Sequence, residues 1–254
     1  EPRGDGVRVV TDRATYEADA LVFTAGSWNS RLMPWLHGLA TPERQVLIWM
    51  QPERPELFQP ANFPVFNCLV DEGRFYGFPV YGVPGFKFGK YHHFEETGAP
   101  EELNREPLRA DEEMLREFAA RYFPQATGPT MTLKMCMFTN APDGHFIVDL
   151  HPEYPQVSFA SACSGHGYKF ASVIGEILAD LAQRRTCRHD ISLFALSRFG
   201  GPLSSLHRDK VELIRRGLPG VEMHVITPGQ TRTWSAEETT DARHWGKQDI
   251  RTFW

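Results

Sequence analysis

Lys87 lies between two phenylalanines in a strand-like run at residues 85–93, which is an unusual place for a lysine. If this run is a strand, alternation places Lys87, Gly89, Tyr91 and His93 on one face. A lysine that faces inward needs a partner or a chemical role, because burying an unpaired ammonium is costly. The pattern leaves two interpretations: an edge-strand lysine that faces water, or a cation that faces a site.

Cys136 stands between Met135 and Met137 in a second run, at residues 134–139. A cysteine among apolar side chains is either a packing residue or a thiol used in chemistry. The remaining cysteines are far apart and form no C-x-x-C pair, which argues against a zinc knuckle and a disulfide scaffold and favours a reducing cytoplasm. They are Cys68, Cys163 and Cys187.

Residues 164–169 (SGHGYK) place two glycines around His166 and bring Lys169 directly before a predicted helix. Such a turn presents backbone N–H donors and suits a carboxylate or another negatively polarised ligand. Gly26 and Ser27 follow an apolar run in a similar way. A glycine there either brings the backbone close to a cofactor or makes a plain tight turn.

The elements that must position these residues change in kind along the chain. Residues 7–11 and 20–25 are predicted strands joined by a turn, the second buried on both faces, with a short helix after residue 28. From 44 to 94, prolines and glycines separate strand patterns, which indicates an antiparallel sheet. The strands expected in this stretch are 45–50, 65–70, 74–79 and 86–93.

Two amphipathic helices follow, at 111–123 with Asp111 as N-cap and at 172–183. Between them, strands are expected at 131–139, 145–150 and 156–162. The composition changes after Phe199, where a short helix is expected only at 208–216.

Composition limits the class of protein. The chain has 254 residues, 41% of them hydrophobic and 23% charged, as in soluble globular proteins. The net charge is −5 and the basic residues are scattered, which disfavours nucleic acid binding. No apolar run approaches the roughly 20 residues of a membrane span. The first residue is Glu1 rather than Met, which suggests a processed or truncated chain.

Taken in order, these segments resemble the monomeric sarcosine oxidase and N-methyl-L-tryptophan oxidase family of FAD enzymes. The resemblance covers residues 7–199. It runs through YEADALVFTAGSWNSRLM, PERQV, FYGFP, GFKFGKYHH, KMCMFTNAPDGHFIVDLHP, SGHGYKFASVIGEILADLA and HDISLF.

The resemblance implies an α+β fold, the C-terminal part of a two-domain FAD-dependent oxidoreductase. Residues 1–40 would be the last strands and helix of the FAD-binding domain, 41–130 a mixed or antiparallel-sheet substrate domain, and 131–199 a return to the FAD-binding domain. Residues 200–254 match nothing in the family. Its nucleotide-binding G-x-G-x-x-G unit occurs nowhere in the sequence. An N-terminal FAD-binding half is therefore expected to be missing.

The resemblance also implies roles for single residues. Cys136 matches the cysteine that forms a thioether to the flavin, with Met137 beside it. Lys87 matches the lysine that promotes reaction of reduced flavin with oxygen. Lys169 matches the lysine that binds the substrate carboxylate, and Tyr76 matches an active-site tyrosine. The residues matching flavin contacts are Gly26, Ser27, Gly165, His166, Gly167 and Lys169.

The chain departs from the family at one catalytic position. The family's active-site histidine lies four residues after the oxygen-activating lysine, where this chain has Tyr91. Tyr91 would replace it, with a different substrate as the consequence, or a register shift would bring a following histidine inward. His93, which keeps the inward parity of Lys87, is the second candidate.

The implied function is oxidation of a secondary amine or N-methyl amino acid by FAD, giving an imine and hydrogen peroxide. The partners would be a small amine and oxygen, with no nucleic acid, membrane or metal. The alternative is a truncated, non-catalytic fragment, or a subunit that needs a separate FAD-binding half. An FAD-dependent dehydrogenase that avoids oxygen is a third possibility, which Lys87 disfavours.

Overall fold

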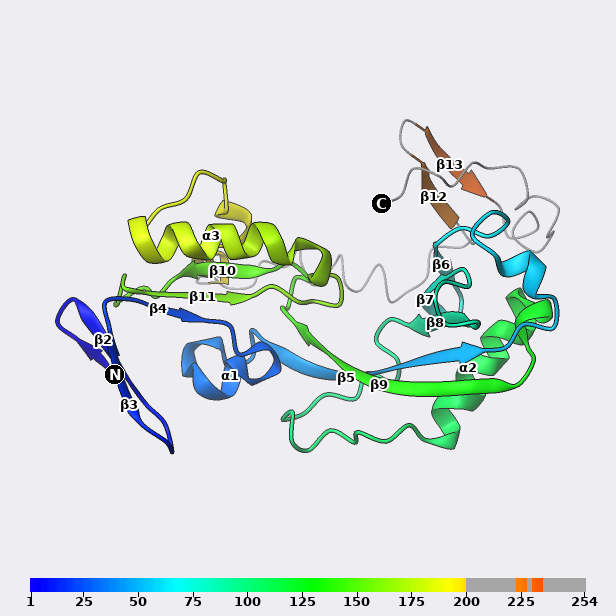
Figure 1. Ribbon diagram of the computed structural model, residues 1–254, viewed down its shortest axis with the longest axis horizontal. Coiled ribbons are helices and arrows are strands. Elements are labelled where there is room, and N and C mark those ends of the chain that lie inside the picture. The colour runs from blue at the N-terminus through cyan, green and yellow to red at the C-terminus, as the bar shows by residue number, and fades with distance from the viewer. Residues whose placement is uncertain (200–222, 228–229, 235–254) are drawn as a thin grey trace. The chain divides into compact units, whose positions relative to one another are not determined.

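The computed structural model describes residues 1–199, 223–227 and 230–234, and the chain forms two compact units (Figure 1). Of these residues, unit 1 contains 1–43, 97–102 and 138–199. Unit 2 contains 44–96, 103–137 and the two short C-terminal strands. The boundaries fall after residues 43 and 137, whereas the sequence suggested changes after 40 and 130. The assignment of these parts to FAD-binding and substrate domains stays a prediction.

Unit 1 is built on a mixed three-stranded sheet packed on both faces. Strands β10 (Ile147–Leu150) and β11 (Val157–Ser161) are antiparallel, and β4 (Leu21–Phe23) runs parallel to β11. Helix α3 (Ala171–Arg184) lies along one face, as Figure 1 shows, and confirms the helix predicted at 172–183. The buried side chains of α3 pack against those of β10 and β11. The opposite face of the sheet packs against the segment that follows β4. The α3 residues are Ile174, Ile177, Leu178 and Leu181.

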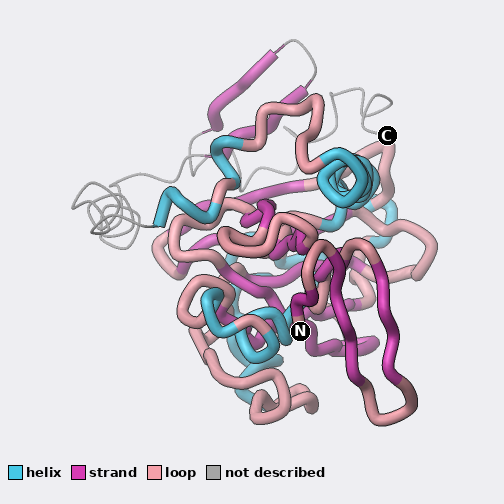
Figure 2. The backbone as a smooth tube through the Cα atoms, turned by 90° about the vertical axis from the view of Figure 1, so that its left-hand side faces the viewer, coloured by secondary structure: helices cyan, strands magenta, loops and turns pink. Residues whose placement is uncertain are grey.

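The N-terminal region of unit 1 corrects two predictions. A second sheet, β1 (Pro2–Arg3), β2 (Gly6–Val10) and β3 (Thr15–Ala18), extends beside the N-terminus (Figure 2). The expected turn therefore contains a strand, whose four residues are all exposed and give no hydrophobic alternation. Strand β4 is shorter than expected and lies at a sheet edge, where Val22 is 42% exposed. The prediction that it is buried on both faces was wrong.

Unit 2 is built on a seven-stranded sheet with the order β13-β12-β6-β7-β8-β5-β9. Strands β6, β7, β8 and β5 form consecutive antiparallel pairs, as the sequence predicts. The last of the expected strands ends at Lys90 rather than at residue 93. The bounds are β5 (Thr41–Met50), β6 (Phe66–Val70), β7 (Gly73–Phe78), β8 (Phe86–Lys90), β9 (Thr130–Asn140), β12 (Met223–Thr227) and β13 (Gln230–Trp234).

Helix α2 (Arg109–Tyr122) covers one face of this sheet and closes a phenylalanine-rich core. The rings of Phe75 and Phe118 stack with their centroids 3.7 Å apart. Each fully buried ring of this size contributes about 1.5–3 kcal/mol by burial. Leu108, rather than Asp111, occupies the N-cap position. Asp111 is the third helical residue, and its carboxylate accepts the Leu108 N–H at 2.6 Å.

The α+β class and the mixed and antiparallel sheets are thus confirmed. The helix expected at 208–216 lies outside the described residues. In the described part of the chain, no helix has the length and apolar character needed to cross a membrane. Short helical turns complete the chain: η1 (Gly26–Trp28), α1 (Asn29–Leu32), η2 (Pro34–Leu36), η3 (Pro55–Phe58), η4 (Pro124–Ala126), η5 (Tyr168–Phe170), η6 (Ser192–Phe194) and η7 (Leu196–Phe199).

Candidate active site

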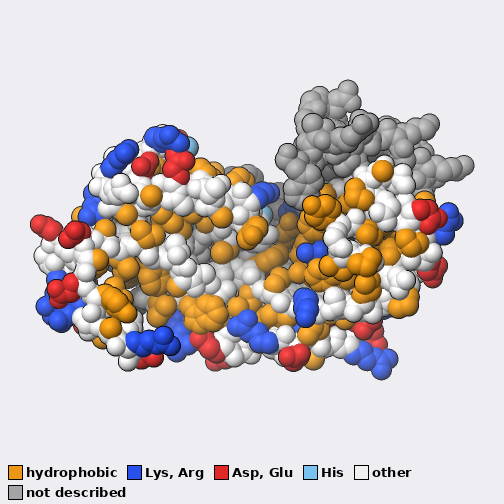
Figure 3. All heavy atoms as spheres, in the orientation of Figure 1, with side chains coloured by type: hydrophobic (Ala, Val, Ile, Leu, Met, Phe, Trp, Pro, Cys, Tyr) orange, Lys and Arg blue, Asp and Glu red, His pale blue; other side chains and the backbone are white. Residues whose placement is uncertain are grey.

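The strand register of unit 2 sorts side chains between two faces. Lys87 pairs with Trp49 on β5 and with Phe78 on β7, while the neighbouring Phe86 and Phe88 enter the core under α2. The face away from α2, here called the outer face, therefore carries Trp49, Tyr76, Phe78, Lys87 and Gly89. Figure 3 shows hydrophobic side chains gathered over β6–β8.

Lys87 is half-buried on the outer face between aromatic rings. Its Nζ lies 4.7 Å from the centroid of the Trp49 ring and 5.4 Å from that of Phe78, within reach of cation–π attraction. None of the described carboxylates forms an ion pair with it. Because no carboxylate in the described part of the chain neutralises it, the Lys87 cation can stabilise negative charge on a bound molecule.

Tyr76 lies across β8 because Gly89 leaves room for its ring. A Cβ on Gly89 would stand 3.2 Å from the Tyr76 hydroxyl. The ring also packs against Tyr91, with centroids 4.8 Å apart. Burial raises the pKa of the Tyr76 phenol, and the neighbouring Cys136 and Tyr91 raise it further. The phenol therefore stays protonated and can donate a hydrogen bond.

Cys136 belongs to the same group of residues. Leu133 on β9 packs on the core, so alternation turns Cys136 toward the outer face and Met137 away from it. Burial raises the pKa of the Cys136 thiol, and the Lys87 ammonium opposes this rise. A nearby cation favours the thiolate, the reactive form of cysteine.

His93 does not join this group. Strand β8 ends at Lys90, so the alternation that was to bring His93 to the face of Lys87 does not reach it. Its ring is buried, and Nε2 lies 2.8 Å from Asp111 Oδ1. The parity prediction was wrong because the chain turns directly after β8. Tyr91, in the same turn, does lie beside Tyr76.

The glycine-rich segment of unit 1 forms a tight loop before α3. A Cβ on Gly167 would stand 1.7 Å from the Ala162 carbonyl oxygen. Gly165 has φ +74°, and a Cβ added there would stand 2.6 Å from the Phe138 ring. Only glycine fits both positions. His166 is exposed, and its Nε2 lies 3.2 Å from the carbonyl oxygen of Gly144. Lys169 is exposed, with Nζ 5.4 Å from the Phe170 ring.

Gly26 and Ser27 also belong to unit 1. They begin the η1 turn, which two residues separate from the end of β4, and the Ser27 hydroxyl lies 2.9 Å from the Thr139 hydroxyl. The candidate residues therefore fall into two groups. Unit 2 brings together Lys87, Tyr76, Tyr91 and Cys136, and unit 1 carries Gly26, Ser27, Gly165, His166, Gly167 and Lys169.

The structure adds two residues that the sequence pattern missed, Trp49 and Phe78. They flank Lys87 from neighbouring strands, and only the strand register reveals them. An aromatic surface with an unneutralised cation and a nearby thiol fits a flat ring system that gains electrons, as a flavin does. The donor set of unit 2 is therefore consistent with a flavin site.

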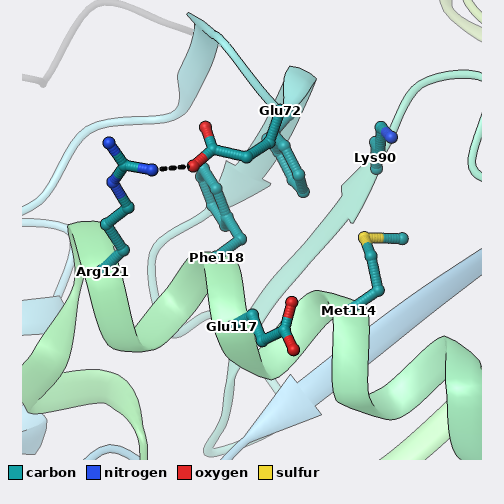
Figure 4. Close-up of a pocket in the computed structure, with 7 residues that line it drawn as sticks. Glu72, Lys90, Met114, Glu117, Phe118 and Arg121 are labelled. Carbon is teal, nitrogen blue, oxygen red and sulfur yellow. Dashed lines mark hydrogen bonds and ion pairs between the residues drawn. The ribbon is translucent and has the colours of Figure 1, made fainter.

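A separate pocket lies on the α2 side of the sheet and contains none of these candidates (Figure 4). Its volume is about 340 Å³. An ion pair between Glu72 and Arg121 borders it, and the Tyr122 hydroxyl donates to Glu72 at 3.0 Å. The lining residues are Glu72, Phe75, Lys90, Met114, Glu117, Phe118 and Arg121.

Comparison with known families identifies the chain. Residues 1–181 match the family model described as "FAD dependent oxidoreductase" (DAO). The chain belongs to this family. The membership implies FAD as the cofactor and confirms the resemblance derived from the sequence.

The relatives of this chain are named sarcosine oxidases and N-methyl-L-tryptophan oxidases. The chain is 40% identical over 198 residues to a monomeric sarcosine oxidase from Bacillus sp. (strain NS-129), covering 76% of this chain and 51% of that protein. It is 38% identical over 200 residues to an N-methyl-L-tryptophan oxidase from Yersinia pestis (strain Pestoides F), covering 76% and 52%. The chain thus spans about half the length of these relatives.

Solved structures agree on the fold. NikD, an unusual amino acid oxidase essential for nikkomycin biosynthesis, matches 77% of this chain and 52% of its own, with a TM-score of 0.59 and 21% identity. Amadoriase I, a fructosyl amine:oxygen oxidoreductase from Aspergillus fumigatus, matches 72% and 43%, with a TM-score of 0.57 and 18% identity. At these identities the likeness shows the fold alone.

Proposed function

We propose that this chain is part of an FAD-dependent oxidase that acts on a secondary amine or N-methyl amino acid. The observation that carries the proposal is the half-buried Lys87, held over Trp49 and Phe78 beside Cys136. Such a cation suits a site where negative charge develops during the reaction. The names of the relatives, sarcosine oxidase and N-methyl-L-tryptophan oxidase, support an N-methyl amino acid as substrate.

When bound, FAD would supply two-electron oxidation of the amine C–N bond with oxygen as final acceptor, so that the products are an imine and hydrogen peroxide. Lys87 would stabilise negative charge on oxygen. Tyr76 and Tyr91 would orient the amine, and Lys169 would bind its carboxylate. No catalytic base is required from these residues if the amine binds in its neutral form.

Cys136 would hold the flavin covalently through a thioether. Forming this bond would remove one hydrogen from the Cys136 thiol and one from the flavin, and oxygen would take both hydrogens with their two electrons as hydrogen peroxide. Further contacts with the cofactor are proposed for the backbone of Met137 on β9, whose side chain points away from the outer face, and for the two glycine turns of unit 1. Those turns are made by Gly26, Ser27, Gly165, His166 and Gly167.

A second candidate rests on the absence of G-x-G-x-x-G from the 254-residue sequence. In this alternative, the chain is a non-catalytic fragment or a subunit, and a separate FAD-binding half completes the site. The compartment proposed in either case is a reducing cytoplasm, in which Cys136 remains a thiol until the flavin attaches.

The test is the visible absorption spectrum of the purified chain before and after acid precipitation. We expect flavin absorbance to stay with the pellet for the unchanged protein and for the control Cys163→Ser, and to move to the supernatant for Cys136→Ser. Flavin that stays with the Cys136→Ser pellet would contradict the covalent assignment. A colourless chain would favour the second candidate, and the FAD-binding half would then have to be supplied.

A further inference from the structure

The turn that follows β8 carries two residues with different surroundings. Tyr91 directs its ring toward Tyr76, and the Arg74 guanidinium lies 4.5 Å from the Tyr91 ring centroid. Two residues later, the His93 side chain is fully buried. Between them, His92 has φ +55°, a left-handed conformation that costs a non-glycine residue roughly 1–2 kcal/mol. The surrounding contacts must hold this turn in place.

The His93 ring supplies such a contact through a buried charged cluster. His93 Nε2 lies 2.8 Å from Asp111 Oδ1, and the other Asp111 oxygen accepts the Leu108 N–H. Arg44 donates to both oxygens of Asp111, at 2.8 and 2.7 Å. An ionised carboxylate accepts hydrogen bonds but donates none. His93 Nε2 must therefore carry a proton and donate it in the hydrogen bond to Asp111.

Arg44 fixes the cluster to the rest of unit 2. Its Nε donates to the Asn104 carbonyl and its Nη2 to the Glu106 carbonyl, both at 2.9 Å. Burial opposes ionisation of Asp111, but the hydrogen bonds from Arg44, Leu108 and His93 outweigh it and lower the pKa of the carboxyl. Asp111 is therefore a charged, fully bonded anchor at the start of α2.

We propose that His93 is a positioning residue, which holds the turn through Asp111 and Arg44 and so keeps Tyr91 packed against Tyr76. Its relevance to catalysis rests on the proposed function, in which the two tyrosines orient the amine. His93 itself does not touch the substrate. The backbone bond from Tyr91 N–H to the Arg74 carbonyl, at 2.8 Å, fixes only the entry to the turn.

The test labels the tyrosines with 3-fluorotyrosine and follows them by fluorine NMR, with Tyr91→Phe and Tyr76→Phe assigning the two signals. His93→Leu removes the donor to Asp111, and His93→Gln restores an N–H near the position of Nε2. His92→Asn is the control in the same turn, because Asn tolerates a left-handed conformation. We expect both signals to shift in His93→Leu and to return toward their original positions in His93→Gln. The His92→Asn spectrum should match that of the unchanged protein.

Unchanged Tyr91 and Tyr76 signals in a folded His93→Leu would overturn the proposal. If His93→Leu does not fold, His93→Asn provides the same comparison, because its shorter amide cannot reach Asp111. Kinetics of the flavin-loaded enzyme form a second arm. We expect His93→Leu to raise KM for the amine about tenfold and to change kcat little. Shifted signals with an unchanged KM would support the positioning role of His93 and contradict the tyrosine pair's place in the amine site.

Discussion

At the scale of single residues, the outer face of unit 2 joins side chains that differ in kind but depend on each other. The positive charge of Lys87 opposes the rise that burial causes in the pKa of the Cys136 thiol. The rings of Trp49 and Phe78 hold this ammonium by cation–π contacts, which do not neutralise its charge. The Tyr76 ring occupies the space that Gly89 leaves open. A change at any of these positions should therefore have a distinct chemical signature.

Lys87→Met should slow oxygen reduction far more than flavin reduction. The reason is that Met keeps the length of the side chain and removes the charge that would stabilise negative oxygen. We expect a loss of about 100-fold or more in the oxygen half-reaction, measured by stopped-flow absorbance. Lys90→Met, on the same strand but outside the outer face, is the control. If both half-reactions fell equally, the role of Lys87 toward oxygen would be wrong.

The stability of unit 2 should depend on pH through His93. Burial lowers the pKa of His93 below its ordinary value of 6.5, although the bond to Asp111 opposes the shift and the positive charges of Arg44 and Lys90 assist it. Below pH 6.5, His93 therefore takes up a proton more readily in the unfolded chain than in the folded one. Since the unfolded state binds more protons, the free energy of unfolding falls as pH falls.

His93→Gln should reduce this acid loss of stability, as measured by denaturant titrations at about pH 7.5 and about pH 5.5. Some loss should remain for the chain as a whole, because burial also lowers the pKa of His151 in unit 1. Equal losses in the variant and the unchanged protein would mean that His93 titrates normally in the folded state.

At the scale of elements, the loop before α3 depends on backbone contacts too close for a side chain. Gly167→Ala would place a Cβ 1.7 Å from the Ala162 carbonyl oxygen, so the loop must move. We expect a clear loss of thermal stability and a change in the environment of Lys169. Gly175→Ala, within α3, meets no atom within 4 Å and should stabilise the protein by about 0.5–1 kcal/mol.

The two glycine variants can be compared by circular dichroism melting. Opposite shifts in Tm would show that the constraint at Gly167 is steric. A Gly167→Ala protein as stable as the original would mean that the loop accepts a side chain, and its close approach would not be needed.

At the scale of the whole chain, two units with separate cores should respond separately to core mutations. Leu178→Ala in α3 and Phe88→Ala in β8 each remove a buried side chain and should cost about 2–5 kcal/mol. Hydrogen exchange should rise mainly in β10, β11 and α3 for the first variant, and mainly in β6–β8 and α2 for the second. Equal increases throughout both units would mean that the chain unfolds as a single cooperative body.

Much of the fold could be predicted from local patterns. The helix at 172–183 and the strands of unit 2 have strong apolar periodicity, and they formed within a few residues of their expected bounds. Strand β3 was missed because all four of its residues are exposed. The residue type of Asp111 predicts an N-cap, whereas the helix starts two residues earlier and uses this carboxylate at its third residue.

The sequence by itself determined the family, the flavin chemistry that the family implies, and the residues that could carry it. These properties depend on residue types and their order along the chain. Only the tertiary structure decided which residues meet. It placed Trp49 and Phe78 beside Lys87 and gave Tyr91, rather than His93, the place next to Tyr76. The physical reason is that strand register and the end of β8 depend on long-range pairing and packing, which local periodicity does not encode.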